Sequence, residues 1–171
     1  MVEFALVGIP LIFILISIFE ISRGMWMYET VAHAVRDGAR YAAVHGQDCA
    51  TVPNSCAVNI SDIAAVIKNA GAGLDPDQFT VTISTAVGTA TLATTGASTL
   101  TALGTNTSGF SGWTYVPAGG GSASATGPGN DVIVSGQFPF KSALAMFWPG
   151  GGKVTFSIVN LGATSRERID F

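Results

Sequence analysis

Residues 4–19 read FALVGIPLIFILISIF, sixteen consecutive residues without a charge, with Glu3 and Glu20 on either side. At about 1.5 Å per residue, an α-helix of this length covers roughly 24 Å, slightly less than the ~30 Å hydrocarbon core of a bilayer. The stretch is therefore a marginal membrane span. It fits a signal-peptide core, a bitopic anchor, or a helix that lies first in lipid and later in a protein bundle. A cleavable signal is disfavoured, because no basic residue precedes the stretch and no Ala-x-Ala pattern follows it.

Beyond this apolar stretch, apolar and small residues continue to recur at the spacing of an α-helix through residues 20–45 (EISRGMWMYETVAHAVRDGARYAAVH). The charged residues there lie mainly off a stripe of apolar or small residues, namely Ile21, Met25, Tyr28, Val31, Ala32, Val35, Ala39, Ala42 and Ala43. The pattern predicts one continuous helix of about forty residues and about 60 Å. Pro10 is expected to kink or locally open it. A domain of the remaining size cannot cover such a helix, so its first half needs lipid or neighbouring subunits.

The composition excludes several classes of protein. The chain has 171 residues, enough for one ordinary domain, and only 11% of them are charged, against an average of about 25%. The mean hydropathy of +0.45 is too high for a freely soluble enzyme of this size. With eight Lys and Arg and a net charge of -3, the chain has no basic patch for nucleic acid.

A second uncharged stretch spans the 53 residues between Asp77 and Asp131, and nineteen of residues 80–129 are Ser or Thr. Partial alternation of β-branched residues in QFTVTISTAVGTATLATTG (78–96) predicts a strand. DVIVSGQF (131–138) and KVTFSIVNLGAT (153–164) also have the composition of strands, and glycine-rich turns separate them from the first. The fold class expected is α+β: a long, partly transmembrane N-terminal helix followed by a small antiparallel sheet.

The Thr/Ser-rich stretch has three interpretations that the sequence leaves open. Residues 88–126 fit low-complexity, poorly ordered loops. They also fit an exposed or glycosylated face, since Asn59-Ile-Ser61 and Asn106-Thr-Ser108 match the acceptor pattern for N-linked glycosylation. The third interpretation is packing against other copies. Three aromatic residues in a Gly/Ser loop form either a contact surface or, more simply, a hydrophobic plug: Phe110, Trp113 and Tyr115.

The two cysteines, Cys49 and Cys56, are seven positions apart in CATVPNSC. This spacing does not match a CxxC pair, and no further cysteine or His cluster completes a zinc site. Pro53-Asn54 supplies a turn that can bring the two sulfurs together, so a local disulfide is expected, with two free buried thiols as the alternative. A disulfide would place the region after the helix outside the cytosol.

Motifs for catalysis are absent from the sequence. It contains no GxSxG, P-loop or HExxH motif, and no GxGxxG that opens a helix. His33 and His45 are twelve positions apart, about 120° on a helical wheel, and therefore do not share a face of the predicted helix. We expect neither an enzyme nor a bound metal or cofactor.

Glu3, at the head of the apolar stretch, has two interpretations. A carboxylate at a helix N-terminus is favoured by the helix dipole, and this alone accounts for it. If the helix entered a bundle of identical helices, however, Glu3 would be buried and would need a cation. The α-ammonium of an adjacent copy is the nearest one, and such a pair would set the axial register between subunits.

Four segments carry a resemblance to a known family: VEFALVGIPLIFILISIFEISRG, VRDGARYAAV, GNDVIVSGQFPF and GATSRER. The first two resemble the N-terminal half of TadE-like pilins, and the last two resemble the late strands of that family. The resemblance implies a type IV pilin-like subunit of the tight-adherence (Tad) class. Such subunits are cleaved by a prepilin peptidase, held in the bacterial inner membrane, and extracted by pilus assembly machinery into an extracellular homopolymer.

The resemblance implies specific roles and a division of the chain. Residues 1–46 would form the membrane anchor and later the filament core, and residues 47–171 an exported β-rich region. Glu3 matches the glutamate that aligns subunits. The residues assigned to the filament core are Phe4, Leu6, Pro10, Leu11, Phe13, Leu15 and Phe19.

The sequence departs from the family pattern in three ways. The family has its glutamate at the fifth mature position, whereas here it is the third, and the basic leader is missing, so we expect either a start inside the mature protein or different processing. The chain is also longer than the family's abundant filament-forming pilins. An alternative function is therefore a membrane-anchored minor pseudopilin or adhesin that initiates or tips a pilus and binds a surface or glycan.

Overall fold

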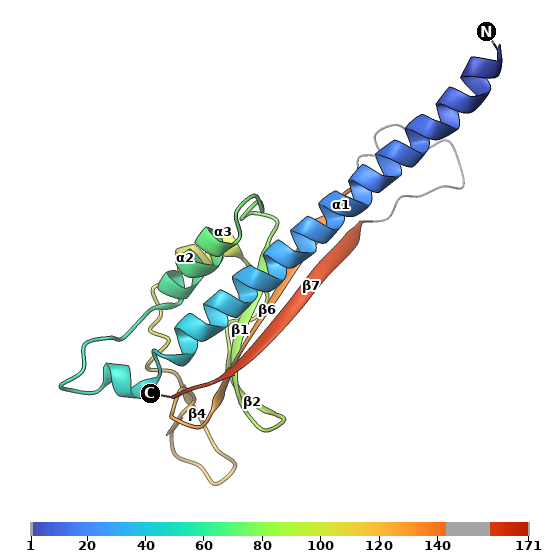
Figure 1. Cartoon of the computed structure of the whole chain (residues 1–171). Helices are drawn as coiled ribbons and strands as arrows, with labels where there is room; N and C mark the ends of the chain where they lie inside the picture. Colours follow the sequence, from blue (N-terminus) through green and yellow to red (C-terminus); the bar gives the residue numbers. More distant parts are fainter. Residues whose placement is uncertain (1, 143–157, 171) are drawn as a thin grey trace.

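The structure is a computed structural model that describes residues 2–142 and 158–170. One long helix, α1 (Val2–Ala43), runs the length of the molecule, and a compact head of strands and short helices packs along its second half (Figure 1). The first half extends beyond the head toward the N-terminus. This arrangement confirms the α+β, pilin-like fold class expected from the sequence.

The helix α1 is uninterrupted over 42 residues. It continues through Pro10, so the helix is not interrupted there, although proline removes one backbone hydrogen-bond donor at that position. Polar side chains in the apolar part bond back to the helix itself. The hydroxyl of Ser17 donates to the carbonyl oxygen of Phe13 at 2.8 Å, and that of Ser22 to Ile18 at 2.9 Å. These bonds satisfy the two hydroxyls without water.

The main sheet is antiparallel, as expected, with its strands in the order β2-β1-β6-β7. Its strands are β1 (Thr80–Val87), β2 (Ala90–Thr94), β6 (Asp131–Phe140) and β7 (Val159–Arg168), and the short β3 (Ser98–Thr99) also pairs with β1. The stretch predicted as one strand over 78–96 is a hairpin, because Gly88, with a φ of 59°, turns the chain between β1 and β2. Part of the strand predicted over 153–164, residues 153–157, lies outside the described residues.

Three short helical segments in the head were not predicted: the 3₁₀ helix η1 (Gln47–Ala50), α2 (Ile60–Ala70) and α3 (Leu100–Gly104). The sequence does carry a signal for α2. Asn59 and Asp62 form a capping box in which the Asn59 backbone N–H donates to Asp62 Oδ2 at 2.8 Å. Buried residues then recur at helical spacing, at Ile60, Ile63, Ala64 and Ile67.

The core lies between the sheet and two helices, α2 and the second half of α1. From α1 it receives Val31, Ala34, Val35, Ala39, Ala42 and Ala43. From the sheet it receives alternate residues of β1 and β6, namely Val81, Ile83, Val132, Val134 and Phe138. The alternation predicted for these strands therefore reflects one face packed against helices and one polar face.

Residues 88–126 contain the short elements β2, β3 and α3 and a two-stranded hairpin, β4 (Thr114–Tyr115) with β5 (Ala123–Ser124). Phe110 is fully buried, and its ring centroid lies 5.3 Å from that of Trp113. These two rings form the plug that fixes the loop to the core. The stretch is thus a folded part of the head and not a run of loops without structure of their own.

Candidate functional site

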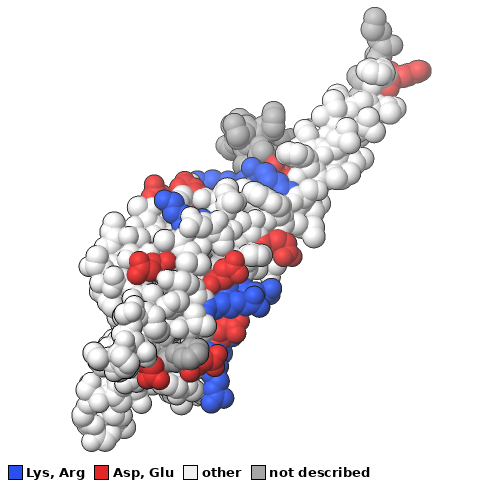
Figure 2. Space-filling model, turned by 60° about the vertical axis from the view of Figure 1, so that its left-hand side comes forward, with Lys and Arg blue, Asp and Glu red and all other residues white. Residues whose placement is uncertain are grey.

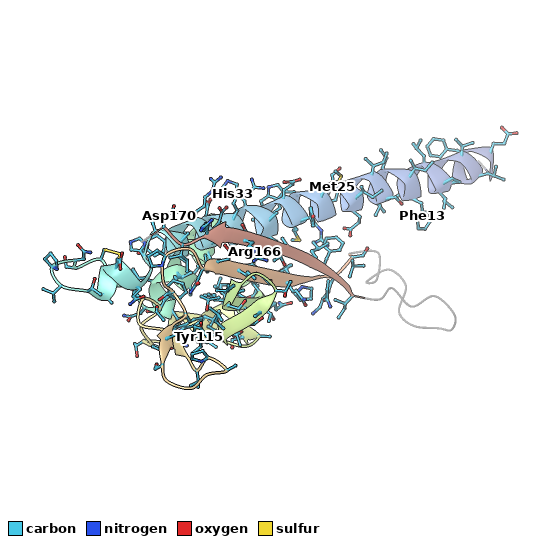
Figure 3. The ribbon with its side chains drawn as sticks, turned by 90° about the horizontal axis from the view of Figure 1, so that it is seen from below. Phe13, Met25, His33, Tyr115, Arg166 and Asp170 are labelled. Atoms are coloured by element: carbon cyan, nitrogen blue, oxygen red, sulfur yellow. A yellow bond between two sulfur atoms is a disulfide. The ribbon has the colours of Figure 1, made fainter. Side chains whose placement is uncertain are left out.

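The first half of α1 exposes a continuous apolar surface. Of the residues assigned to the filament core, Phe4 is 84% exposed, Phe13 48% and Phe19 69%, and the others are exposed as well. Figure 3 shows Phe13 on the part of the helix that the head does not reach. In Figure 2 this part is white between acidic atoms near its free end and charged atoms at its base. So large an exposed apolar surface indicates lipid or protein contacts.

The helix is long and apolar enough to cross a membrane over part of Leu6–Ala43. Only 6% of its apolar window is buried within the chain, whereas a core helix of a soluble protein would be mostly buried. From Leu6 to Arg23 the helix rises about 26 Å, close to the hydrocarbon thickness of a bilayer. These features fit membrane anchoring.

Glu3 lies in the first turn of α1 and is exposed. Figure 1 shows the N-terminal end of α1, whose first turn contains Glu3, protruding beyond the head. Its location at the helix N-terminus satisfies the dipole interaction that was expected on general grounds.

A charged cluster marks the point where the helix meets the head. Arg23 Nη2 lies 3.5 Å from Glu20 Oε2, one turn earlier, and the Glu20 side chain is only 8% exposed. The Arg23 guanidinium also lies over the ring of Phe140, 4.8 Å from its centroid, and donates to the carbonyl oxygen of Lys141. Arg23 therefore joins the last apolar turns of α1 to the end of β6.

An apolar groove of about 530 Å³ opens beside this cluster. One wall is α1, from Glu20 to Glu29, and the other is the adjoining ends of β6 and β7. Its apolar lining is formed by Ile21, Met25, Tyr28, Phe140, Val159 and Leu161. The groove directly continues the exposed surface of the protruding helix, and Figure 3 labels Met25 at the start of the head.

Sequence reasoning missed the strand side of this groove. The strand predicted over 131–138 stops two residues before Phe140, which ends β6. The register pairs Phe140 with Val159 and Phe138 with Leu161. The sequence alone does not fix this pairing, so the groove could not be derived from it. Arg23 carried a weak signal, since it is a cation three residues after Glu20 on the same helix.

The loop after α1 is closed by a disulfide between Cys49 and Cys56, whose Cα atoms are 4.7 Å apart. Within the loop, Asn54 Nδ2 donates to the carbonyl oxygen of Asp48 at 2.8 Å. Outside it, the Gln47 backbone N–H donates to the Thr126 carbonyl oxygen at 2.9 Å. The loop is thereby held against the Thr/Ser-rich part of the head.

Both residues of the acceptor patterns already have structural roles. Asn59 caps α2 and is exposed. Asn106 is half-buried, and its Oδ1 accepts a hydrogen bond from the Ser108 backbone N–H at 2.9 Å. The two asparagines belong to neighbouring segments, since the Ser61 N–H donates to the Asn106 carbonyl oxygen.

The two histidines have separate local partners. His33 Nδ1 lies 3.1 Å from Asp37 Oδ2, and His45 Nδ1 lies 2.7 Å from the Tyr41 carbonyl oxygen. Within residues 2–142 and 158–170, no group of three His, Cys, Asp or Glu side chains is arranged to hold a metal ion.

These features define an α+β protein of pilin-like architecture, and its long apolar helix fits membrane anchoring. Residues 1–40 match the family model described as TadE-like protein, which confirms the resemblance of the N-terminal segment and supports a TadE-like protein of the Tad system. No curated protein and no solved structure matches the chain.

Proposed function

We propose that the protein is a structural subunit of an extracellular, type IV pilus-like filament of the Tad class, and that it polymerises through the first half of α1. The observation that carries this proposal is the apolar helix surface that the head leaves uncovered. Before assembly the same surface would lie in the inner membrane, where prepilin peptidase and the assembly machinery act on the chain. After assembly it would contact the same helices of other copies.

The energetics fit a filament that needs a motor to form and then persists. Burying about ten large apolar side chains at roughly 1.5–3 kcal/mol each is worth on the order of 15–30 kcal/mol relative to water. Relative to lipid the gain is much smaller, because lipid already covers these side chains. Extraction from the membrane would therefore require work from the machinery, and the assembled filament would not dissolve in water.

We propose that the helix of a neighbouring copy binds in the apolar groove beside Met25. Its lining is mostly apolar, and a second helix bound in it would lie alongside the protruding half of α1. Bulky residues on the neighbour's helix, such as Leu11 and Phe13, would fill it. Arg23 would hold the strand wall of the groove against α1.

Glu3 would set the axial register between copies. In the helix bundle it would be desolvated, and a desolvated carboxylate needs a cation. We propose that this cation is the α-ammonium of the adjacent copy. Mispaired registers would leave a buried charge without compensation, so one register would be selected.

Replacement of Glu3 tests the proposal. In cells with the complete Tad machinery, Glu3→Ala and Glu3→Leu are expected to abolish or greatly slow filament assembly while membrane insertion continues. Asp48→Ala is the matched control, because it removes an exposed acid at the other end of the molecule. Filaments recovered by shearing would be quantified by immunoblot. Normal filament yield from Glu3→Leu would refute the alignment role.

A second function is favoured by the length of the chain and by the uncharged tip of the head (Figure 2): a minor pseudopilin or adhesin that initiates or tips a pilus and binds a surface or glycan. Negative-stain microscopy with labelled antibody separates the two functions. Label along whole fibres favours the structural subunit, whereas label confined to fibre ends favours the minor component.

A further inference from the structure

Two hollows lie on either side of Trp113 and Thr114, in the part of the head that carries β4. The first, of about 360 Å³, is bordered by the turn at residues 47–51 and by the β4–β5 hairpin. The second, of about 350 Å³, is bordered by the end of β2 and by residues 106–108. Both fall within the roughly 300–1,000 Å³ range of small-molecule sites. Figure 1 places β4 at the end of the head opposite the N-terminus, away from any membrane that holds α1.

Neither hollow is lined by a charged side chain. The polar groups around the first are the amide of Gln47 and hydroxyls such as those of Thr51 and Ser122. Those around the second include the hydroxyl of Thr95 and the amide of Asn106. In Figure 2 the tip of the molecule opposite the protruding helix is likewise white. Such a lining suits a ligand whose own polar groups are neutral, because phosphates and carboxylates are bound by charged side chains or helix termini.

Some of these polar groups are engaged in the fold and others are available. Thr95 Oγ1 accepts a hydrogen bond from the Ile83 backbone N–H at 3.0 Å, so its position is fixed. The side chains of Gln47, Thr114 and Ser122 form no hydrogen bond with any residue that the structure describes. They present an amide and two hydroxyls, each able both to donate and to accept.

Trp113 supplies a fixed apolar surface between the two hollows. Its ring is half-buried and packs against Phe110, and its backbone is held on both sides: its N–H donates to the Phe110 carbonyl oxygen at 3.0 Å, and its carbonyl oxygen accepts from Ala125 at 2.8 Å. A pyranose ring has an apolar C–H face and a rim of hydroxyl groups. An aromatic ring between neutral amide and hydroxyl groups is complementary to both parts.

We propose that the two hollows beside Trp113 form one binding site for a neutral oligosaccharide, with a sugar unit in each hollow. The site lies in the head and requires no contact between copies. The proposal therefore applies both to a filament subunit and to a minor component. For the adhesin function, it specifies neutral oligosaccharides as the class of ligand.

The test uses the full chain in detergent micelles, where it can be studied as a monomer. Neutral tetrasaccharides of glucose, mannose and N-acetylglucosamine would be titrated against it, with a tetrasaccharide of galacturonic acid as the anionic comparison, and binding followed by saturation-transfer NMR. At least one neutral tetrasaccharide is expected to bind with a Kd of about 1 mM or lower. No binding at about 10 mM by any neutral member, or equal binding of the anionic one, would overturn the proposal.

One variant in each hollow tests whether the sugar binds there. Gln47→Ala and Asn106→Ala are each expected to weaken binding about three- to tenfold, the effect of one hydrogen bond. Gln137→Ala, an exposed amide on β6, is the matched control and should leave the Kd unchanged. Since Trp113→Ala disturbs the core, Trp113→Phe serves to retain packing while reducing the ring surface. An unchanged Kd in both Gln47→Ala and Asn106→Ala would place the sugar elsewhere and refute the site.

Discussion

Gly38 of α1 and Ile67 of α2 lie so close that no side chain fits between them. A Cβ atom placed on Gly38 would be 2.4 Å from Cγ1 of Ile67 and 2.8 Å from its Cδ1. Both residues are buried, and the contact lies in the half of α1 that packs into the head. This glycine therefore lets α2 approach the α1 backbone within the part of the helix that the head covers.

Replacing Gly38 by alanine is expected to destabilise the head, although alanine is the better helix former by about 1 kcal/mol. The new methyl group would displace Ile67, and overpacking of this kind costs roughly 1–3 kcal/mol. Because the Cβ would lie only 2.4 Å from Cγ1 of Ile67, we expect a cost in the upper part of this range and a net loss of up to about 2 kcal/mol. For a chain of this size, that lowers Tm by up to about 8 °C. Thermal unfolding in detergent micelles measures the change.

Gly24→Ala is the matched control on the same helix. Its Cβ would meet the Phe140 ring at 3.6 Å, an ordinary contact, so helix propensity should dominate and Tm should stay the same or rise. In addition, Ile67→Ala should make Gly38→Ala less harmful, because the clashing atoms are gone. If Gly38→Ala raised Tm as Gly24→Ala does, the close approach of the two helices would be wrong.

The disulfide is expected to stabilise the distal end of the head and not the anchor. Replacing both Cys49 and Cys56 by serine frees a short loop, and the chain-entropy model assigns about 2–3 kcal/mol to its closure. Because Gln47 bonds to Thr126, the freed loop should also loosen the segment beside it. Hydrogen exchange should rise around residues 47–58 and 111–126, while membrane insertion of α1 remains normal. Unchanged exchange at Thr126 would show that the loop does not support its neighbour.

Two variants of Asn59 distinguish its structural role as a helix cap from a role as a glycosylation acceptor. Asn59→Asp keeps a good helix cap but destroys the acceptor pattern, so the stability of α2 should be retained. Asn59→Ala removes the side-chain cap and is expected to lower the free energy of unfolding by about 1 kcal/mol. Circular dichroism melts measure stability, and mass spectrometry of the wild-type chain reports any attached glycan. Equal loss of stability in both variants would mean that the cap contributes nothing.

The long helix could be predicted because two patterns typical of helices follow one another over about forty residues. The first is the uncharged apolar stretch, and the second is the helical spacing of apolar and small residues before residue 45. The strands β1 and β6 were likewise visible through alternating Val and Ile. The helix α2 was missed because it is short and lies in a region read as β-rich, although the Asn59–Asp62 capping box was present in the sequence. The turn at Gly88 divided one predicted strand into two, because a single glycine reverses the chain there.

Of the two walls of the apolar groove, only the wall formed by α1 could be predicted from the sequence. The exposure of apolar residues on α1, such as Phe13, follows from the sequence, since a helix of about 60 Å is too long for a domain of the remaining size to cover. The opposite wall follows from the register of β6 and β7, which places Phe140 beside Val159. That register depends on packing between segments far apart in the chain, which a single sequence does not specify.

The most direct test of the central claim is photo-crosslinking from Phe13. A photoreactive phenylalanine analogue at this position would be irradiated in intact cells with the complete Tad machinery, and membrane and sheared extracellular fractions would be analysed separately. If the protruding helix moves from lipid into a bundle of copies, the extracellular fraction should contain a crosslinked product of two chains, formed between N-terminal helices as identified by mass spectrometry. Extracellular protein that gives no crosslink between copies from Phe13 would contradict the account.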